Sequence, residues 1–171
     1  FQGPEKRLTY PWAKGILADS MLSYYDEVGF RDWTHAITGA PALKAQHPEF
    51  ELYSQGIHAR SGVACADCHM PYQTEGGVKF TNHHITSPLA YISTSCQVCH
   101  RETEETLKQN VYERQSKIKE LSTTAEEILV KAHIEAKAAW DAGATEDEMK
   151  EVMTLIRHAQ WRWDFIAASH G

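Results

Sequence analysis

From residue 101 onward, polar and apolar positions alternate with the period of an α-helix. Residues 101–142 contain neither Pro nor Gly, and apolar or small side chains return every three or four positions. These positions are Leu107, Val111, Ile118, Leu121, Ala125, Ile128, Ala132, Ala136 and Ala139. At ~1.5 Å per residue, the stretch predicts an amphipathic helix of ~60 Å. Gly143 ends the pattern.

A second helix is predicted after Gly143. Thr145 and Glu148 have the spacing of a capping box, in which each side chain binds the other residue's backbone N–H. The apolar stripe that follows is Met149, Val152, Met153, Ile156, Trp163 and Ile166, and the helix runs towards His170. We expect the two helices to form an antiparallel hairpin. A helix of ~40 residues is long for such a chain, so an exposed stripe used for dimerisation is the alternative to a buried core.

The first hundred residues have a different pattern, because they hold all six Pro and eight of the ten Gly. This composition indicates short elements and many turns, with very little strand. The expected elements are helices from about Trp12 to Glu27, from Asp32 to Thr38 and across Pro48 to about Ala59, a turn at Gly76-Gly77 and a short extended piece at Val78–Thr81. The predicted fold class is mostly α, with a region at 1–100 and a long helical hairpin at 101–171 that together form one domain.

Composition narrows the class of protein. The apolar fraction of 42% and the charged fraction of 23% are those of an ordinary water-soluble domain. The formal net charge of −6 argues against a nucleic-acid partner. No apolar run approaches the ~18 residues that a membrane-spanning helix needs.

The four Cys all lie in two C-x-x-C pairs, and each pair is followed directly by His. The motifs are Cys65-Ala-Asp-Cys68-His69 and Cys96-Gln-Val-Cys99-His100. Disulfides or a four-Cys zinc site would use the thiols but would not need the two His. Attachment of a c-type haem needs two thiols for the vinyl groups and an imidazole for the iron. The sequence therefore predicts two covalently bound haems on this chain.

Ten His in 171 residues is a high count. His69 and His100 are the expected proximal ligands, and multihaem cytochromes commonly place a second His on each iron. The remaining candidates are His35, His47, His58, His83, His84, His133, His158 and His170. Periodicity and spacing do not pair them, and each taken singly is more often a surface or core residue than a ligand.

Several segments resemble the pentahaem, ammonia-forming cytochrome c nitrite reductases of the bacterial periplasm. They are Lys44-Ala-Gln-His-Pro-Glu49, Gly56-Ile-His58, Cys65-Ala-Asp-Cys-His-Met-Pro71, Thr81-Asn-His83, Cys96-Gln-Val-Cys-His100 and Arg157-His-Ala-Gln-Trp-Arg-Trp163. The likeness keeps order and spacing from roughly Tyr10 to Gly171. It implies that this chain covers the region of the fourth and fifth haems.

The resemblance also implies what lies elsewhere. The first three haem motifs, including the C-x-x-C-K motif of the catalytic haem, would precede Phe1. A His beyond Gly171 would complete the haem at Cys65 and Cys68. We therefore expect an internal fragment of a longer, exported protein, which agrees with a start that lacks the basic and apolar regions of a signal peptide.

By resemblance, His47 is the distal-pocket histidine that hydrogen-bonds nitrite and helps to deliver protons, a task suited to an imidazole. Gln46, through its side-chain oxygen, and Lys44, through its carbonyl, resemble ligands of the calcium beside the catalytic haem. His58 resembles the distal ligand of the haem at Cys96 and Cys99. His83 resembles the distal ligand of the second haem, for which adjacent His84 is the alternative.

The resemblance implies six-electron reduction of nitrite to ammonium by the full-length protein, in the periplasm, with five haems and calcium. The implied partners are a second copy, bound through the long helices, and a donor that is either a membrane quinol-oxidising or a small periplasmic multihaem cytochrome. The alternatives are an electron-transfer multihaem cytochrome without its own substrate and a relative that converts hydroxylamine or tetrathionate. A C-x-x-C-K motif upstream would decide against pure electron transfer.

Overall fold

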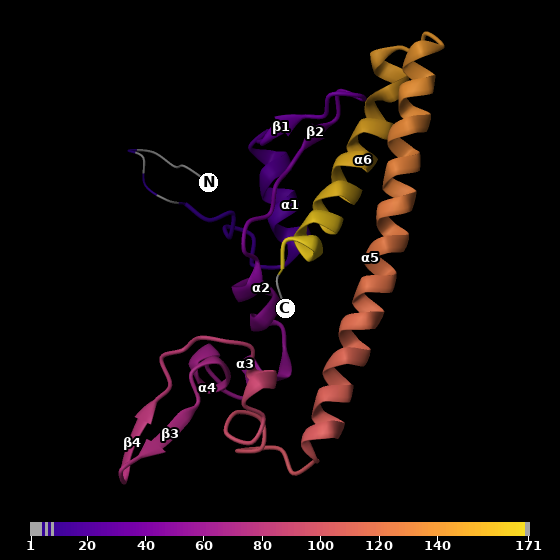
Figure 1. Ribbon diagram of the computed structural model, residues 1–171. Helices are drawn as coiled ribbons and strands as arrows, with labels where there is room; N and C mark the ends of the chain where they lie inside the picture. Colours follow the sequence, from indigo (N-terminus) through magenta and orange to yellow (C-terminus); the bar gives the residue numbers. More distant parts are fainter. Residues whose placement is uncertain (1–4, 6, 8, 170–171) are drawn as a thin grey trace. The chain divides into compact units, whose positions relative to one another are not determined.

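The computed structural model describes residues 5, 7 and 9–169 (Figure 1). The chain divides into two compact units. The helix unit consists of the described residues up to Leu52 and those from Leu121 onward, and the motif unit is Tyr53–Glu120. The long helix α5 (Glu104–Asp141) contributes residues to both. The functional division expected at residue 100 stays a prediction.

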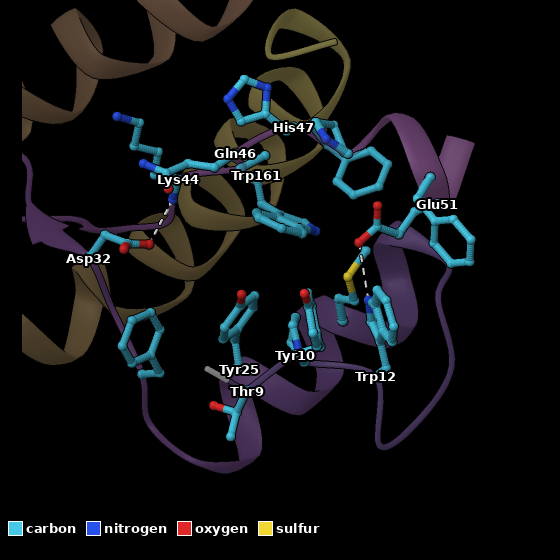
Figure 2. A pocket seen from close by; sticks show the side chains of 17 residues that line it. Thr9, Tyr10, Trp12, Tyr25, Asp32, Lys44, Gln46, His47, Glu51 and Trp161 are labelled. Carbon is cyan, nitrogen blue, oxygen red and sulfur yellow. Dashed lines mark hydrogen bonds between the residues drawn. The ribbon is translucent and has the colours of Figure 1, made fainter. Parts of the chain in front are cut away.

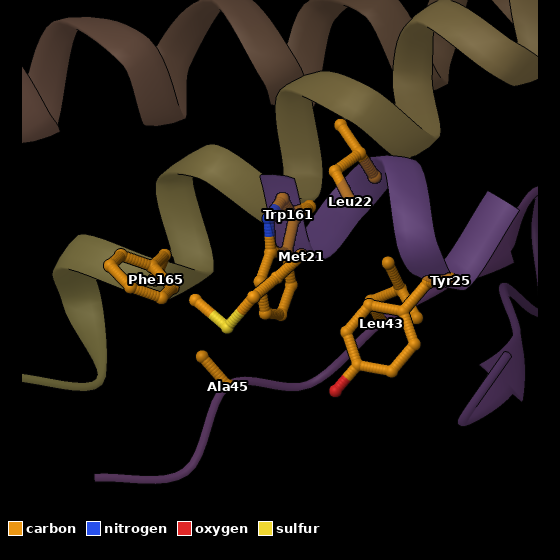
Figure 3. Close-up of a cluster of buried hydrophobic side chains, with 7 residues drawn as sticks. All are labelled: Met21, Leu22, Tyr25, Leu43, Ala45, Trp161 and Phe165. Atoms are coloured by element: carbon orange, nitrogen blue, oxygen red, sulfur yellow. The ribbon is translucent and has the colours of Figure 1, made fainter. Parts of the chain in front are cut away.

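The main core of the helix unit forms where α1 (Ala18–Glu27) packs on α6 (Glu146–Ala167). Figure 3 shows side chains of both helices closing over an extended segment of the chain. The buried residues of this core are Met21, Leu22, Tyr25, Leu43, Ala45, Trp161 and Phe165. The side chain of Leu43 is 0% exposed, and its full burial stabilises the unit by about 1.5–3 kcal/mol.

A charged network also joins α1 to α6. The Arg157 guanidinium is buried and donates from Nε to Oδ1 of Asp26 at 2.8 Å and from its NH2 group to the carbonyl of Phe30 at 2.8 Å. His158 lies 2.7 Å from the other Asp26 oxygen. A buried guanidinium with several acceptors is stabilised by its partners, so the loss of Asp26 would loosen the two helices.

The long helices confirm the predicted hairpin. A second core holds Ala136 of α5 together with Met149 and Ile156 of α6. Gly143 ends the first helix with a φ of 92°, a value that favours glycine. In the predicted capping box, Thr145 Oγ1 accepts from the Glu148 N–H at 3.4 Å, and Glu148 Oε2 accepts from the Thr145 N–H at 2.8 Å.

Helix α5 begins three residues later than expected. Thr103 Oγ1 accepts from the backbone N–H of Thr106 at 3.2 Å, so Thr103 caps the helix and the chain before it lies outside. Much of the apolar stripe on α5 is exposed, and Ile128 retains 64% of its accessible surface. The stripe is therefore only partly used within this chain.

The prediction of a helix at residues 32–38 is wrong. Strand β1 (Trp33–Thr34) pairs antiparallel with β2 (Pro41–Ala42), and Gly39 turns the chain between them at a φ of 75°. Backbone pairing across this turn outweighs the local helical pattern, because a propensity signal over seven residues is weak.

Two further helices are shorter than expected. Gly15 has a φ of 114°, so helix α1 starts only at Ala18. The stretch from Pro48 to Ala59 forms two helices, α2 (Glu49–Ser54) and α3 (Ile57–Arg60), because Gly56 is extended between them. Gly lowers helical stability by roughly 1 kcal/mol relative to Ala, which favours a break at this position.

The motif unit consists of short elements. After α3, helix α4 (Cys65–His69) leads into a hairpin of β3 (Tyr72–Glu75) and β4 (Val78–Thr81), and a 3₁₀ turn, η2, follows at Pro88–Ala90. The predicted turn at Gly76-Gly77 is confirmed, with positive φ at both residues. The predicted extended piece is strand β4.

The mostly α-helical fold class, with short elements before two long C-terminal helices, is confirmed. Strands in the described part of the chain are confined to two short hairpins. None of the described helices is both long enough and apolar enough to cross a membrane.

Candidate functional site

The first Cys motif forms helix α4, which places Cys65, Cys68 and His69 on adjoining positions of one short helix. Asp67 starts the helix by accepting the backbone N–H of Ala64 at 2.7 Å. Both thiols are free. Burial raises the pKa of the Cys68 thiol, and the nearby Cys96 raises it further. Cys68 and Cys96 thus lie near each other within the motif unit.

A hydrogen bond orients the His69 ring. Its Nδ1 lies 3.0 Å from the carbonyl oxygen of Thr86. Because a carbonyl oxygen only accepts, Nδ1 must carry the proton, which leaves Nε2 with a free lone pair. This is the arrangement in which a protein presents histidine to a metal, because the second hydrogen bond sets both tautomer and ring direction.

The second Cys motif is wound as a turn. The backbone N–H of His100 donates to the carbonyl of Cys96 at 2.9 Å, and the N–H of Cys99 donates to the same carbonyl at 3.2 Å. These bonds hold Cys96, Cys99 and His100 on one tight turn. His100 Nδ1 also lies 3.8 Å from Oε2 of Glu102. Nε2, the other ring nitrogen, is therefore the candidate metal ligand.

The structure brings His58 and His100 together. Their ring centroids are 6.0 Å apart and their planes meet at 83°. Two imidazoles on opposite sides of one metal ion, each at a bond of about 2 Å, have centroids ~6 Å apart. This spacing fits the predicted pair of ligands for the second motif. Both side chains are exposed on the protein surface.

The remaining ligand candidates, His83 and His84, follow strand β4. Asn82 is buried, and its Oδ1 accepts the backbone N–H of His84 at 2.9 Å. This contact anchors the backbone and leaves both imidazoles exposed. The choice of His83 stays a prediction.

The motif unit has little apolar interior of its own. Its buried side chains, over residues 53–120, which are all described, are Pro71, Asn82, Ile92 and Ser95. Large apolar side chains such as Ile57, Ile85 and Val98 are exposed. A unit of this size needs further apolar contact to be stable, and two haem macrocycles held by the four thiols would supply it. The residues present therefore fit haem.

A third group of predicted residues lies in the helix unit. Lys44, Gln46 and His47 have exposed side chains and border a cavity of about 550 Å³ (Figure 2). Lys44 donates its backbone N–H to Oδ2 of Asp32 at 2.8 Å. His47 has a φ of 53°, which is uncommon for a residue other than glycine, and its Nδ1 lies 3.8 Å from Oε1 of Glu49. Strain of this kind often occurs at functional sites.

Polar groups face the same cavity from other elements. Trp12 donates from its indole nitrogen to Oε1 of Glu51 at 3.1 Å. Burial raises the pKa of Tyr25 to about 12, with a smaller contribution from Asp32, so its hydroxyl keeps its proton at neutral pH. Among the described residues, no three His, Cys, Asp or Glu side chains gather closely enough to hold a metal ion. A calcium ion bound here would need ligands in addition to Lys44 and Gln46.

The sequence analysis missed one histidine cluster. His35 and His133 stack with ring centroids 3.9 Å apart, and Thr38 Oγ1 lies 3.2 Å from Nδ1 of each ring. Burial, and then the charge of His35, lower the pKa of His133. No periodicity connects residues so far apart in the chain, so sequence reasoning had no means to pair them.

Comparison with known proteins adds the family. The family described as cytochrome c552 matches residues 1–171. The chain is 63% identical over 171 residues to the cytochrome c-552 of Parabacteroides distasonis and 61% identical over the same length to that of Bacteroides thetaiotaomicron. Each match covers 100% of this chain and 35% of the relative. The chain thus spans about a third of the length of these curated relatives.

A solved structure has the same fold. The cytochrome c nitrite reductase of Desulfovibrio desulfuricans matches with a TM-score of 0.90 and 34% identity, over 98% of this chain and 38% of that one. The structure of its catalytic subunit contains two calcium sites.

Proposed function

The chain belongs to the cytochrome c552 family, and we propose that the protein of which it forms a part reduces nitrite to ammonium with six electrons. The family confirms the resemblance found in the sequence. The observation that carries the proposal is the cavity bordered by Lys44, Gln46 and His47, in a chain that matches a nitrite reductase over 98% of its length.

We assign two c-type haems to the motif unit. Their thioether bonds would be made by the four Cys, and His69 and His100 would be the proximal ligands. His58, 6.0 Å from His100 between ring centroids, would be the second ligand of the latter haem. Haem supplies one-electron redox chemistry when it is bound. A pair of imidazoles leaves no open position, so the second motif suits electron relay instead of substrate binding.

The other haem contacts extend beyond this chain. His83 would ligate a haem held outside it, and the distal ligand of the haem at Cys65 and Cys68 would lie beyond Gly171. With the upstream motifs, including that of the catalytic haem, the whole protein would hold five haems.

His47 would act on the substrate. Its imidazole borders the cavity and belongs to neither haem motif, and it would hydrogen-bond a nitrite oxygen and pass a proton to it. A positively charged or proton-donating group at this position stabilises the negative charge that develops as each N–O bond breaks.

Gln46 and Lys44 would bind calcium. The carboxamide oxygen of Gln46 and the carbonyl of Lys44 are the neutral oxygen donors that this hard cation accepts. The ion would support the segment that presents His47, and it would take no part in the redox step.

We propose the cell compartment and the partners on the same basis. Haem attachment through CxxCH motifs takes place outside the cytoplasm, so we place the protein in the periplasm. The exposed apolar stripe of α5, which includes Ile118, Leu121 and Ile128, would bind a second copy. A membrane quinol-oxidising or a small periplasmic multihaem cytochrome would donate electrons.

The deciding experiment compares His47→Ala with wild type in the full-length protein, by nitrite-dependent oxidation of a reduced viologen. We expect turnover to fall by ~10² to 10⁴, because a proton donor and a hydrogen bond are lost. His47→Asn, which keeps hydrogen bonding but cannot titrate at neutral pH, should retain more binding than turnover.

Haem content and low-spin spectra should stay intact in both variants. His35→Gln, which alters an imidazole of the same unit that does not line the cavity, serves as the matched control and should keep its turnover. If wild-type protein transfers electrons but leaves nitrite unreduced, the alternative of a pure electron-transfer cytochrome holds. Near-normal turnover of His47→Ala would remove the active-site assignment of this segment.

A further inference from the structure

Two polar side chains of α6 bind the backbone of the chain just before Gln46 and His47. Gln160 Oε1 accepts the backbone N–H of Leu43 at 2.9 Å, and Gln160 Nε2 donates to the carbonyl of the same residue at 2.6 Å. One turn later on the helix, Asp164 Oδ2 accepts the backbone N–H of Ala45 at 2.6 Å. Gln160 and Asp164 therefore satisfy three backbone groups of an extended segment that has no neighbouring strand there.

The spacing of the two elements explains this match. Residues four apart on a helix are separated by about 6 Å along its axis, and residues two apart on an extended chain by about 6.6 Å. Gln160 and Asp164 thus meet Leu43 and Ala45 in register. The contact replaces a strand partner with a helix face, and a shift by one residue would break every bond.

Burial makes these bonds hard to replace. Gln160 is 8% exposed, and Leu43 and Ala45 belong to the main core. If the carboxamide were removed, the N–H and carbonyl of Leu43 would be left buried without partners, which costs more than the bonds themselves contribute. Burial also raises the pKa of Asp164, while the bond from Ala45 lowers it, so the carboxylate is held partly out of water for this contact.

The register decides which side chains of this segment are buried and which are exposed. Since side chains alternate along an extended chain, holding Leu43 and Ala45 inward turns Lys44 and Gln46 outward. The next residue, His47, has the left-handed φ of 53°. A backbone in this region persists only where its surroundings hold it, and Ala45, the last residue bound by α6, lies two positions before it.

We propose that Gln160 and Asp164 are positioning residues for the calcium- and substrate-binding segment. They hold Leu43–Ala45 in register and so fix where the Gln46 side chain and the His47 imidazole lie at the border of the cavity. This inference rests on the proposed function for the roles of Gln46 and His47, but the placement of the segment is a property of this chain alone.

The test uses four variants of the full-length protein. Gln160→Leu and Asp164→Leu remove the backbone contacts. Gln160→Asn keeps the amide but is one methylene shorter, so it should behave like Gln160→Leu. Asp164→Asn keeps an oxygen acceptor for the Ala45 N–H and should rescue the wild-type behaviour. Asp26→Asn is the matched control, because it loosens α1 and α6 without touching residues 43–47.

Three quantities are measured. We expect the leucine variants to raise the calcium concentration for half-maximal activity about tenfold or more and to lower kcat more than they raise KM for nitrite. Hydrogen exchange should become faster in the peptide that carries Leu43 and Ala45. Asp26→Asn should lower the unfolding temperature while leaving calcium dependence and exchange in this peptide near wild type.

The outcomes separate the two proposals. Wild-type protein that does not reduce nitrite would refute the proposed function, and calcium binding with hydrogen exchange would still decide the positioning role. If the leucine variants change calcium affinity and local exchange no more than Asp26→Asn does, Gln160 and Asp164 only stabilise the fold. Should either leucine variant fail to fold, Gln160→Asn and Asp164→Asn carry the comparison.

Discussion

The histidines of this chain differ in the neighbouring groups that orient their imidazole rings. His69 is committed to one tautomer by the Thr86 carbonyl, and His58 lies opposite His100 at a spacing that suits two ligands of one metal ion. His47 belongs to the helix unit and borders its cavity, in a backbone conformation that is rarely populated. Geometry thus distinguishes residues that composition treats as equals.

One prediction belongs to this scale. His58→Ala in the full-length protein should leave the haem at Cys96 and Cys99 without its second imidazole, so that iron becomes five-coordinate or binds water. A new high-spin signal should appear in the electron paramagnetic resonance spectrum, while the other centres change little. His84→Ala provides a comparison with an exposed imidazole for which we propose no ligand role at this haem. An unaltered spectrum for His58→Ala would mean that another histidine serves.

At the scale of elements, helices act by what their faces touch. α6 packs apolar side chains on α1. Through Gln160 and Asp164 it also binds the backbone of residues 43–45, which begin the cavity segment, residues 43–47. α5 contacts the turn between β1 and β2 through His133, which stacks on His35 across the Thr38 hydroxyl. Trp140 of α5 adds a bond from its indole nitrogen to the Thr38 carbonyl at 3.0 Å. The turn is thereby fixed against the helix.

This contact predicts a dependence on pH. The pKa of His133 is lowered by burial and by His35, so below the ordinary imidazole pKa of about 6.5 the unfolded chain takes up a proton more readily than the folded one. The neutral His133 therefore contributes its whole stabilisation above that pH. The free energy of unfolding should decrease as the pH falls through this value. In His133→Gln, the free energy of unfolding should no longer show this decrease at acid pH.

Denaturant unfolding of the full-length protein between pH 5 and 8, followed by helix circular dichroism, would measure the effect. Thr38→Val is a useful second variant, because it removes the hydroxyl that bridges the two rings and leaves both imidazoles in place. Equal pH dependence in wild type and His133→Gln would contradict the prediction.

At the scale of the whole molecule, the two units obtain their interiors differently. The helix unit buries aromatic and aliphatic side chains between α1, α6 and the cavity segment. The motif unit, described in full, buries few apolar side chains and carries all four thiols. A unit that cannot bury enough apolar surface needs a covalent or bound component to be stable.

The corresponding prediction concerns mass. Denatured protein should retain two haem masses in the part that corresponds to this chain, because thioether bonds survive unfolding. A variant with Cys65 and Cys68 both changed to Ala should lose one of them and keep the other. A mass equal to that of the bare polypeptide, or stoichiometric zinc, would exclude the haem assignment.

Much of the fold was predictable because it depends on local pattern. The long helices, their capping box and the stop at Gly143 follow from periodicity and from short-range hydrogen bonds. The helix expected at residues 32–38 failed because its residues pair with a second strand. The prediction for the thiol motifs is equally local, since two thiols and an imidazole at fixed spacing indicate haem attachment without reference to the rest of the chain.

The sequence by itself therefore determined the family and the periodic helices, and it predicts the chemistry of the two motifs. All of these depend on residues close along the chain. Only the tertiary structure decided which imidazoles meet and what holds the cavity segment. The Gln160–Leu43 contact joins residues 117 positions apart, and His58 reaches His100 across the whole motif unit. Such contacts depend on burial and register between distant elements, and nothing in the local order of residues specifies them.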